Sequence, residues 1–506
     1  MFQKIDKALF AVLLLVVIFL GIFPRAVELI NHNYLFLIDQ GRDYMAVKNI
    51  VVNHKLTMIG SEIGGGAAGT QGIFQGPVYY YLLSIFFILF NGDPYGGIVM
   101  MFIFSIAAII FSYYFAFKIF KNKWYGLLFA FFVSISHPLI DQARFVWNNH
   151  PSTIFILLAF YFAYLSYKKD GRFIFLSAFF SAFIYNFEIA MAIPISISYI
   201  LYIIFVLKLK VLRKYFYLLS GFILGIFPMI IFEVRHNFIG TRGILNYVFV
   251  KPQVYTVSNA RYDFFGNHIS VFITNFFDTF SLQNPSLAVI IFSVFLLFVV
   301  FLIFKEQDDR IKKFLQYLMF TLIVTFIVFS FLRNYVYYYY LYHLNIAYIF
   351  ICVYAVYKII NLNKTYQGIK ILVLVLISIL AVKSINFSYA NTIRDLSDYG
   401  GTAKIRGKID AIDYIYKDAK GKPFGLFVFT PPVYTYAYDY LLWWYGERKY
   451  HYLPYQEKRG TFYLLIERDG SKPWSYKGWL ETVIKIGKVI YTKKLPSNFI
   501  IQKRVI

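Results

Sequence analysis

The sequence predicts an all-α polytopic membrane protein with about 11 transmembrane helices, juxtamembrane helices in the first outer loop, and a small C-terminal extracytoplasmic α/β domain. Hydrophobic residues make up 59% of the 506 residues and charged residues only 15%, with a mean hydropathy of +0.59. Soluble globular domains are far less apolar than this. Apolar runs recur up to residue 385, after which charged residues become more frequent. We therefore expect a transmembrane module over 1–385 and an α/β domain over 386–506.

The apolar runs give the candidate spans, because a helix needs about 20 apolar residues to cross roughly 30 Å of hydrocarbon. The first run is expected to be a retained helix and not a cleaved signal peptide, because no small-residue cleavage site follows it. The run at 78–90 is short for a span and is expected to lie along the membrane surface. By hydropathy the spans are 8–24, 95–117, 124–140, 151–167, 173–187, 189–207, 215–232, 285–304, 314–332, 336–357 and 371–385.

Basic residues fall between alternate spans, and this predicts the orientation because basic loops stay in the cytoplasm. The N-terminus is then cytoplasmic, in the plasma (inner) membrane, and the segment from about residue 386 lies outside. The net charge of +24 is explained in the same way and does not indicate nucleic-acid binding. With 78–90 at the surface, the cytoplasmic clusters are 4–7, 118–123, 168–172, 208–214, 305–313 and 358–370.

The C-terminal segment has the pattern of a small α/β domain. Residues 425–430 and 461–467 are predicted to form strands, 439–445 a helix, and 488–505 a hairpin that turns near 496–498. A segment of roughly 110 residues is large enough to hold its own core. We expect this domain to lie outside the membrane.

The chain lacks the residues that several classes of function require. Its single cysteine, Cys352, lies in an apolar run, which leaves neither a disulfide framework nor a cysteine-rich metal site. The short cytoplasmic loops carry no glycine-rich phosphate loop. Only His137, His343 and Lys383 interrupt the predicted spans, whereas a transporter needs polar groups along a path through the membrane. This favours an outward-facing site that acts on a substrate already activated in the membrane, such as a sugar carried on a lipid phosphate.

The first outer loop, residues 25–77, is the most informative segment. It carries the motif Asp39-Gln40-Gly41-Arg42-Asp43. Residues 44–54 place apolar side chains on one helical face, which predicts an amphipathic helix along the interface. The segment Gly72-Ile73-Phe74-Gln75-Gly76-Pro77 then leads into the short apolar run at 78–90.

These motifs resemble those of the GT-C fold glycosyltransferases, in the branch that holds protein O-mannosyltransferases and the lipid A aminoarabinose transferase. The shared order is a first span, an Asp-x-x-Arg motif that opens a juxtamembrane helix, a Phe-x-x-Pro return and a short apolar helix. Two further motifs add to a likeness in layout over about the first 350 residues. The resemblance implies a polyprenyl- or dolichyl-phosphate sugar donor and a catalytic aspartate in the first outer loop. The two further motifs are Ala143-Arg144-Phe145-Val146-Trp147-Asn148 and Phe232-Glu233-Val234-Arg235-His236-Asn237.

Asp39 matches the aspartate of that family. Transfer of a sugar from a phosphate to an acceptor hydroxyl or amine requires a carboxylate that takes the proton of the acceptor or stabilises the oxocarbenium-like charge. Attack opposite the departing phosphate would invert the anomeric centre. The alternative is that Asp39 caps the helix that follows it, and the two roles are compatible.

Two further acids raise the question of a cation site. Asp43 lies one helical turn after Asp39, and Asp141 begins the second outer loop. Oxygen ligands from separate loops can bind a divalent cation, as the oligosaccharyltransferase branch of the family implies. Solvated loop residues are the alternative, and Gln40 replaces the second acid that the family usually has. We therefore assign no cofactor and leave a divalent cation open.

The departing phosphate needs cationic side chains, because negative charge develops on it. Arg42 matches the arginine of the family motif. Arg144, Arg235 and Arg333 lie beside spans on the outer side, and the guanidinium fork suits a phosphate. The alternative for each is a snorkelling residue at the membrane interface.

The chain departs from the family at Gly76. The aminoarabinose transferase has a lysine immediately before the proline of its Phe-x-x-Pro motif, where this chain has glycine. We expect Lys48 or Arg144 to hold the phosphate in its place.

Other outward residues are candidates for sugar or lipid binding. Asn148 ends the motif of the second outer loop, and Glu188 lies at an outer helix end, where it could bind sugar hydroxyls or pair with an arginine. Tyr338 and His343 belong to a tyrosine-rich stretch at the outer end of the tenth predicted span. Tyrosines there ordinarily form an interface belt, although their rings also suit a sugar or lipid site.

The sequence therefore predicts a plasma-membrane glycosyltransferase that moves a sugar from a polyprenyl-phosphate-linked donor to an extracytoplasmic protein, lipid or glycan. Its partners are the donor, membrane lipids and an acceptor that the sequence does not identify. Three alternatives stay open: a polytopic transporter, a non-catalytic assembly protein, and a lipid-linked glycan polymerase or ligase. The last would ordinarily crowd basic residues into a large outer loop, and the loop at 235–284 is only modestly basic.

Overall fold

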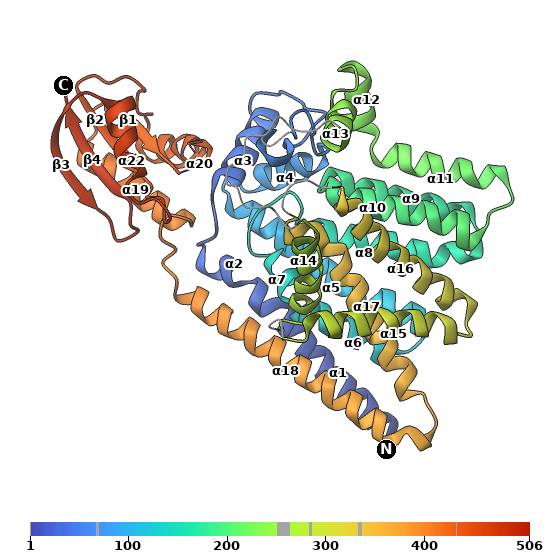
Figure 1. Ribbon diagram of the computed structural model, residues 1–506. Coiled ribbons are helices and arrows are strands. Elements are labelled where there is room, and N and C mark those ends of the chain that lie inside the picture. The colour runs from blue at the N-terminus through green and yellow to red at the C-terminus, as the bar shows by residue number, and fades with distance from the viewer. Residues whose placement is uncertain (1, 67–69, 250–263, 283–285, 332–335, 432) are drawn as a thin grey trace.

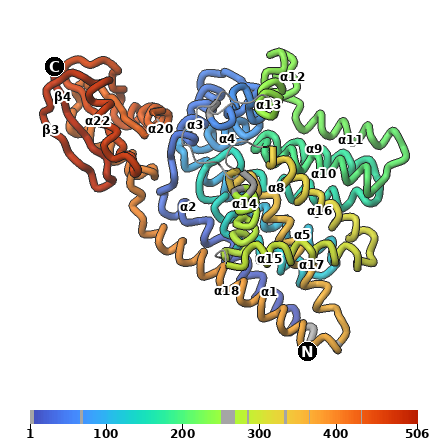
Figure 2. The backbone as a smooth tube through the Cα atoms, in the orientation of Figure 1, coloured from blue at the N-terminus to red at the C-terminus, as the bar shows by residue number. Residues whose placement is uncertain are grey.

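The computed structural model describes residues 2–66, 70–249, 264–282, 286–331, 336–431 and 433–506 (Figure 1). A bundle of helices forms most of the molecule, and a small α/β domain lies beyond one end of it. The N-terminus lies at the opposite end of the bundle from this domain, as the backbone trace in Figure 2 also shows. The predicted fold class is confirmed.

The bundle is built around α17, whose residues are buried on nearly every side. A helix that is apolar on all faces is expected at the centre of a bundle. The long helices are α1 (Phe2–Ile22), α5 (Tyr95–Phe120), α6 (Lys123–Ile135), α8 (Ser152–Leu165), α9 (Gly171–Phe183), α10 (Ile189–Leu201), α11 (Leu212–Gly225), α14 (Phe264–Thr279), α15 (Ala288–Lys305), α16 (Asp309–Ser330), α17 (Tyr342–Ile360) and α18 (Gln367–Ser397).

Further helices connect these or lie at the end of the bundle that is nearer the C-terminal domain. They include the predicted juxtamembrane helices α3 (Ile38–Val51) and α4 (Val78–Leu89), which pack against each other. The others are η1 (Phe23–Arg25), α2 (Val27–Asn31), η2 (Ile63–Gly66), α7 (His137–Asp141), η3 (Ser166–Lys168), η4 (Ile184–Asn186), η5 (Tyr202–Leu207), α12 (Phe227–Arg235), α13 (Ile239–Phe249), η6 (Tyr338–Leu341) and η7 (Lys364–Tyr366).

Fewer helices than expected are long enough to span a membrane. In the described ranges there are 7 by length and composition, or up to 8 if α11 and α12, which are bent by 71°, form one span. Helices at three of the expected spans are shorter. The run at 124–140 breaks at Ser136, where α7 begins with Pro138 in its first turn, and the runs at 151–167 and 173–187 end in the 3₁₀ turns η3 and η4.

One helix falls in the stretch that the sequence analysis treated as an outer loop. Helix α14 packs against α15, α16 and α17. Its Phe276 ring lies 5.2 Å from the ring of Tyr348 on α17. Because α14 contributes apolar rings to the bundle, residues 264–279 of the predicted loop at 235–284 belong to the core.

The basic ends of the helices meet at one end of the bundle. Lys123 pairs with Asp6, which joins the starts of α6 and α1. Lys358 at the end of α17 pairs with Glu306 at the end of α15, at 2.8 Å. At the other end, the Asn31 amide donates to the backbone oxygen of Leu396 near the end of α18, at 3.1 Å. Members of two predicted basic clusters, 118–123 and 358–370, therefore lie at the end of the bundle away from the C-terminal domain.

The C-terminal domain is built on a four-stranded sheet with the order β1-β2-β4-β3. Strands β1 (Gly425–Phe429) and β2 (Thr461–Ile466) are parallel, whereas β4 (Ile500–Val505) runs antiparallel to β2 and to β3 (Lys488–Lys494). The predicted strands and hairpin are confirmed. The helical segments of this domain are α19 (Ile405–Ala419), α20 (Tyr436–Leu441), η8 (Leu442–Glu447), α21 (Arg448–Tyr450), α22 (Ser475–Trp479) and η9 (Leu480–Ile484).

The C-terminal domain shares a hydrophobic core with the outer loops. One face of β2 packs in a small cluster around Phe462, Leu464 and Ile484, while its alternate residues join a core that also contains Tyr44 of α3. The Tyr44 ring lies 5.0 Å from the ring of Tyr440 on α20. This packing holds the sheet domain against α3 and α4.

The backbone also joins the two parts. The Phe36 N–H donates to the Ala403 oxygen at 3.1 Å, and the Ile405 N–H donates to the Tyr34 oxygen at 2.9 Å. Helix α18 continues past residue 385 to Ser397 before the chain enters α19. The segment that precedes α3 is therefore tied to the start of the C-terminal domain.

Candidate functional site

A cavity of about 480 Å³ lies where the outer loops meet the C-terminal domain. Its polar lining includes carboxylates, amides and one guanidinium group, and its apolar lining is largely aromatic. Residues from three parts of the chain line it: Asp39, Arg42, Ser61, Glu62 and Gln75 from the first outer loop; Trp147, Asn148, Asn149, Glu188, Tyr339 and Tyr340 from the rest of the transmembrane module; Tyr434 and Tyr436 from the C-terminal domain.

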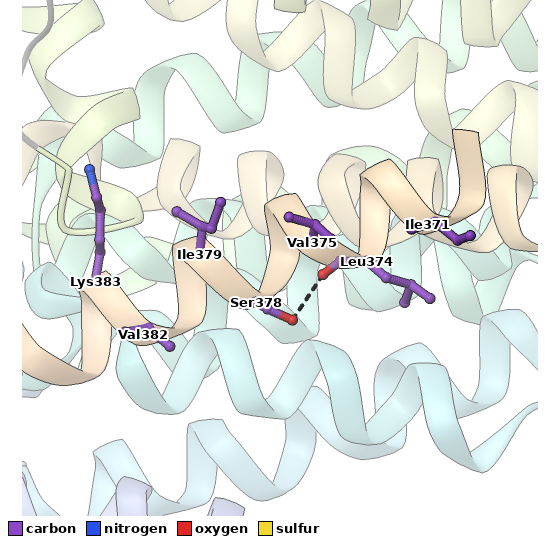
Figure 3. A pocket seen from close by; sticks show the side chains of 7 residues that line it. All are labelled: Ile371, Leu374, Val375, Ser378, Ile379, Val382 and Lys383. Atoms are coloured by element: carbon purple, nitrogen blue, oxygen red, sulfur yellow. Dashed lines mark hydrogen bonds between the residues drawn. The ribbon is translucent and has the colours of Figure 1, made fainter. Parts of the chain in front are cut away.

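A second hollow of about 540 Å³ runs along α18 and has a different character (Figure 3). The Ser378 hydroxyl donates to the Leu374 oxygen at 2.9 Å, and Lys383 lies at one end. The hollow contains no carboxylate, and an apolar groove on a helix of spanning length is where lipid chains are expected. We therefore take the acidic cavity as the candidate active site. The hollow is lined by Ile371, Leu374, Val375, Ser378, Ile379, Val382 and Lys383.

Gln40, and not Asp39, stabilises the start of α3. The Gln40 side-chain oxygen accepts from the Leu37 N–H at 2.9 Å, and its side-chain nitrogen donates to the Val146 oxygen at 2.7 Å. Gln40 therefore joins the first outer loop to the second. Asp39 makes no capping hydrogen bond. Its carboxylate is left to face the cavity.

Arg42 lies between two carboxylates. One of its terminal nitrogens is 2.9 Å from Asp39, and the other is 2.8 Å from Asp43. Asp43 is fully buried, and its second oxygen has no hydrogen-bond partner within the described chain. Burial raises the pKa of Asp43 to about 6, although the Arg42 charge opposes this shift. Asp39 and Asp43 thus share one cation, as their helical spacing predicts.

Glu188 lies on another wall of the cavity and is almost completely buried. It caps α10 by accepting from the Ala190 N–H at 3.2 Å. The Gln75 amide donates to its carboxylate at 3.1 Å and accepts from the Ile189 N–H at 2.9 Å. Burial raises the pKa of Glu188 to about 7, so this carboxyl group exchanges a proton near neutral pH.

The packing of the return segment against residues 185–186 leaves room only for glycine at position 76. A Cβ atom at residue 76 would lie 2.1 Å from the side-chain oxygen of Asn186. The Gly76 N–H donates to the Tyr185 oxygen at 3.3 Å, so the two segments are in direct contact. A lysine cannot occupy this position unless the loop moves.

Four of the residues predicted from sequence line the cavity together. They are Asp39, Arg42, Asn148 and Glu188, and the Asn148 amide is held by the Phe187 oxygen next to Glu188. Asp43 lies behind Arg42. These residues come from separate loops, and the fold brings them to one cavity.

Two aromatic candidates lie elsewhere. Tyr338 is half-exposed and does not line the cavity, whereas its neighbours Tyr339 and Tyr340 do. The Tyr339 ring lies 4.5 Å from the Trp147 ring. His343 is buried in the bundle, with a ring nitrogen 2.8 Å from the Thr325 hydroxyl. The structure therefore places His343 in packing between α16 and α17.

The Arg144 guanidinium is committed to an ion-pair network away from the cavity lining. It donates to both carboxylate oxygens of Glu28, at 2.7 and 3.0 Å, and to Asp395 at 2.7 Å. This network joins the second outer loop to α2 and to the end of α18. The structure therefore pairs Arg144 with acids outside the cavity lining.

The other candidate cations and Asp141 also lie outside the cavity lining. Lys48 lies over the Trp443 ring, 4.2 Å from its centroid, and so contacts the C-terminal domain. Asp141 is 3.4 Å from His137. Arg235 is exposed at the end of α12, and Arg333 lies outside the described residues. Arg42 is therefore the one cationic side chain among the described residues that line the cavity.

The geometry does not assemble a metal site from the expected acids. Across the residues that the structure describes, no group of three or more His, Cys, Asp or Glu side chains could hold a metal ion. Asp43 binds Arg42, and Asp141 pairs with His137 instead. No ligand set for a divalent cation is therefore assigned.

The sequence analysis missed several residues of the cavity. Gln75 belongs to the return segment, but its contact with Glu188 depends on a loop more than 100 positions away. Tyr434 and Tyr436 lie in the C-terminal domain, where no motif marked them. They reach the cavity only because α20 packs against α3. No signal in the sequence alone could have found this contact.

The fold and the cavity define a polytopic membrane protein of GT-C architecture, with outer loops that meet a C-terminal domain over a carboxylate-lined cavity. No family model and no curated protein matches the chain. Among solved structures it is similar to the crystal structure of ArnT from Cupriavidus metallidurans bound to undecaprenyl phosphate, with a TM-score of 0.55 and 11% identity over 99% of this chain and 98% of that chain. The chain is also similar to the apo structure of ArnT from Cupriavidus metallidurans, with a TM-score of 0.55 and 10% identity over 100% of this chain and 99% of that chain. The likeness covers both chains from end to end, so this protein shares the ArnT fold, including the C-terminal domain.

Proposed function

We propose that this protein is a membrane glycosyltransferase that moves a sugar from a polyprenyl-phosphate-linked donor to an acceptor outside the cytoplasm. The observation that carries the proposal is the Asp39–Arg42 pair, which is 2.9 Å apart and lines a cavity shared by the outer loops and the C-terminal domain. The fold is that of ArnT, one structure of which is bound to undecaprenyl phosphate. The similarity in fold supports a polyprenyl-phosphate donor. The carboxylate and guanidinium groups of the cavity support the transfer reaction.

Each group in the cavity has a role in such a transfer. The acceptor oxygen or nitrogen attacks the anomeric carbon as the bond between this carbon and the phosphate oxygen breaks, and the configuration inverts. The Asp39 carboxylate takes the acceptor proton. Arg42 stabilises the negative charge that develops on the departing phosphate. Because Arg42 binds both acids, it also holds Asp39 in a fixed position.

The second wall of the cavity is suited to the sugar. Asn148 and Glu188 are fixed by the backbone and by Gln75, and they present groups that can bind hydroxyls. Trp147 and Tyr339 supply aromatic faces on which a sugar ring can stack. The basic residues at the opposite end of the bundle support an orientation in which the cavity faces away from the cytoplasm.

The experiment is a transfer assay with the purified full chain in vesicles that contain polyprenyl-phosphate sugars with a labelled sugar. We expect label to move from the lipid to an acceptor, and Asp39→Asn to lower the rate by at least about a hundredfold, because general acid–base catalysis contributes this much. Asp170→Asn is the matched control, because Asp170 caps α9 far along the chain and asparagine caps a helix equally well. A normal rate in the Asp39→Asn variant would remove Asp39 from the mechanism.

The same assay separates the alternative functions. Label that crosses the vesicle membrane while still attached to its lipid indicates a transporter. Products with many added units indicate a polymerase, and products that receive a preassembled glycan indicate a ligase. Mass spectrometry of lipid that co-purifies with the protein identifies the carrier independently of turnover.

A further inference from the structure

We infer that Tyr434 and Tyr436 of the C-terminal domain form a binding site for a neutral sugar ring of the acceptor, so that the acceptor is a glycan or a glycolipid. The inference rests on the proposed transferase function and names the substrate class of the same cavity. The two rings are nearly parallel, with centroids 5.7 Å apart and planes at 8°. Both line the cavity that contains Asp39. Exposed, parallel aromatic faces at a cavity wall are suited to stacking on a sugar.

The backbone that carries the two tyrosines is held by hydrogen bonds. The Thr430 hydroxyl donates to the backbone carbonyl oxygen of Tyr434 at 2.9 Å, and the Thr435 hydroxyl donates to the Asp439 carboxylate at 2.9 Å. Tyr436 is the first residue of α20, which packs against α3. The backbone of the tyrosine pair therefore has a set position relative to Asp39 on α3, and the two side chains lie against each other. A preorganised aromatic wall loses little entropy when it binds a ligand.

The position of the pair assigns it to the acceptor and not to the donor. Tyr339 and Tyr340 directly precede the central helix α17, so they form the wall of the cavity on the side of the helix bundle, from which a membrane-bound donor would enter. Tyr434 and Tyr436 belong to the domain that lies beyond the end of the bundle (Figure 1). An acceptor that approaches from outside the bundle meets this domain first. The Asp39 carboxylate lies in the same cavity and can take the proton of its hydroxyl.

The charges in the cavity favour a neutral acceptor. Arg42 is the one cation of the lining among the described residues, and the donor phosphate requires it. Asp39 and Glu62 are acids of the same lining, and Asn149 has a buried amide group with no hydrogen-bond partner within the described ranges. An anionic acceptor would face these acids without a cation of its own. Hydroxyl groups of a neutral sugar can bind carboxylate and amide groups.

The test is saturation-transfer difference NMR on the full chain in detergent. The probes are the neutral disaccharides cellobiose, maltose, mannobiose and chitobiose, together with glucose 6-phosphate as an anionic sugar. We expect at least one neutral disaccharide to bind. Tyr434→Ala and Tyr436→Ala should each raise its Kd by about tenfold, while Tyr434→Phe and Tyr436→Phe, which keep the ring, should stay within about threefold. Trp474→Ala removes an exposed aromatic ring of the same domain outside the cavity lining, and it should leave binding unchanged.

Three results would overturn the inference. They are a failure of all four neutral disaccharides to bind the wild-type protein, binding that survives both alanine substitutions, and tyrosine-dependent binding of glucose 6-phosphate in preference to the neutral sugars. The transfer assay keeps this outcome separate from the proposed function. If disaccharide binding depends on the tyrosine pair but no polyprenyl-phosphate sugar is consumed, the transferase proposal fails while the sugar site stands. If transfer proceeds and the alanine variants keep the wild-type KM for the acceptor, the sugar site fails while the transferase proposal stands.

Discussion

Gly41 lies directly against the backbone of Ala437, so that a Cβ atom on residue 41 would be 2.3 Å from the Ala437 nitrogen. Gly41 belongs to the Asp39–Asp43 motif on α3, and Ala437 lies in α20 of the C-terminal domain. This close approach brings Tyr434 and Tyr436 to the cavity wall. The glycine of the motif therefore serves the contact between the two parts of the molecule.

We predict that Gly41→Ala displaces α20 from α3. The added methyl group meets backbone atoms, which cannot rotate away, and overpacking of this kind costs about 1–3 kcal/mol. We expect a lower thermal unfolding midpoint, faster proteolysis of the C-terminal domain and a reduced transfer rate. Gly368→Ala is the matched control, because a Cβ atom there meets no atom within 4 Å. Unchanged proteolysis in Gly41→Ala would show that the contact does not hold the domain.

We predict a pH-dependent contribution of Glu188 to stability. Burial raises its folded-state pKa from an ordinary value of 4.5 to about 7, so the folded protein keeps the proton more tightly than the unfolded chain. The resulting stabilisation is complete below pH 4.5 and is lost as the pH rises through about 7. The stabilisation amounts to about 3 kcal/mol, because each pKa unit corresponds to about 1.36 kcal/mol.

Thermal unfolding of the wild type and of Glu188→Gln between pH 4 and 8 measures this effect. We expect the unfolding midpoint of the wild type to fall relative to that of Glu188→Gln as the pH rises, because glutamine has no proton to lose. Glu457→Gln changes an exposed carboxylate on the sheet domain, and its pH profile should follow that of the wild type. Parallel profiles for the wild type and Glu188→Gln would contradict the prediction.

We predict that Arg144 supports the fold and does not bind the donor phosphate. Arg144→Ala leaves the carboxylate of Glu28 without its ion-pair partner and Asp395 with Arg394 alone, and breaking a buried ion pair costs about 3–5 kcal/mol. The unfolding midpoint should drop by several degrees, as measured on the detergent-solubilised protein. Arg172→Ala removes an exposed arginine from its pair with Asp170 and should have no measurable effect. A normal midpoint with a raised KM for the donor would instead assign Arg144 to the phosphate.

Much of the fold could be predicted from local patterns. The predicted helices around 44–54 and 78–90 and the strands near 425 and 461 are confirmed, because each has a periodicity that its own residues set. About 11 spans were expected, and 7 or 8 helices among the described residues meet the length criterion, since hydropathy ignores breaks such as the one before Pro138. Helix α14 was missed because its stretch was assigned to an outer loop, whereas its apolar rings pack into the bundle.

The candidate site was only partly predictable. Asp39 and Arg42 could be paired from their spacing on one helix, and they do form an ion pair. The grouping of Asn148 and Glu188 with them could not be established from spacing, because it depends on hydrogen bonds between distant loops. Arg144 was expected near the phosphate, but the structure pairs it with Glu28, a residue on which the sequence analysis placed no role.

The sequence by itself determined that this is a polytopic helical membrane protein with an α/β domain at its C-terminus, because apolar runs, basic clusters and strand periodicity are properties of neighbouring residues. Only the tertiary structure decided that Tyr434 and Tyr436 share a cavity with Asp39, and that Gln40 joins two loops. These contacts arise from packing between segments that are far apart in the chain. Such packing is set by the shapes of the surfaces that meet, and local composition does not record them.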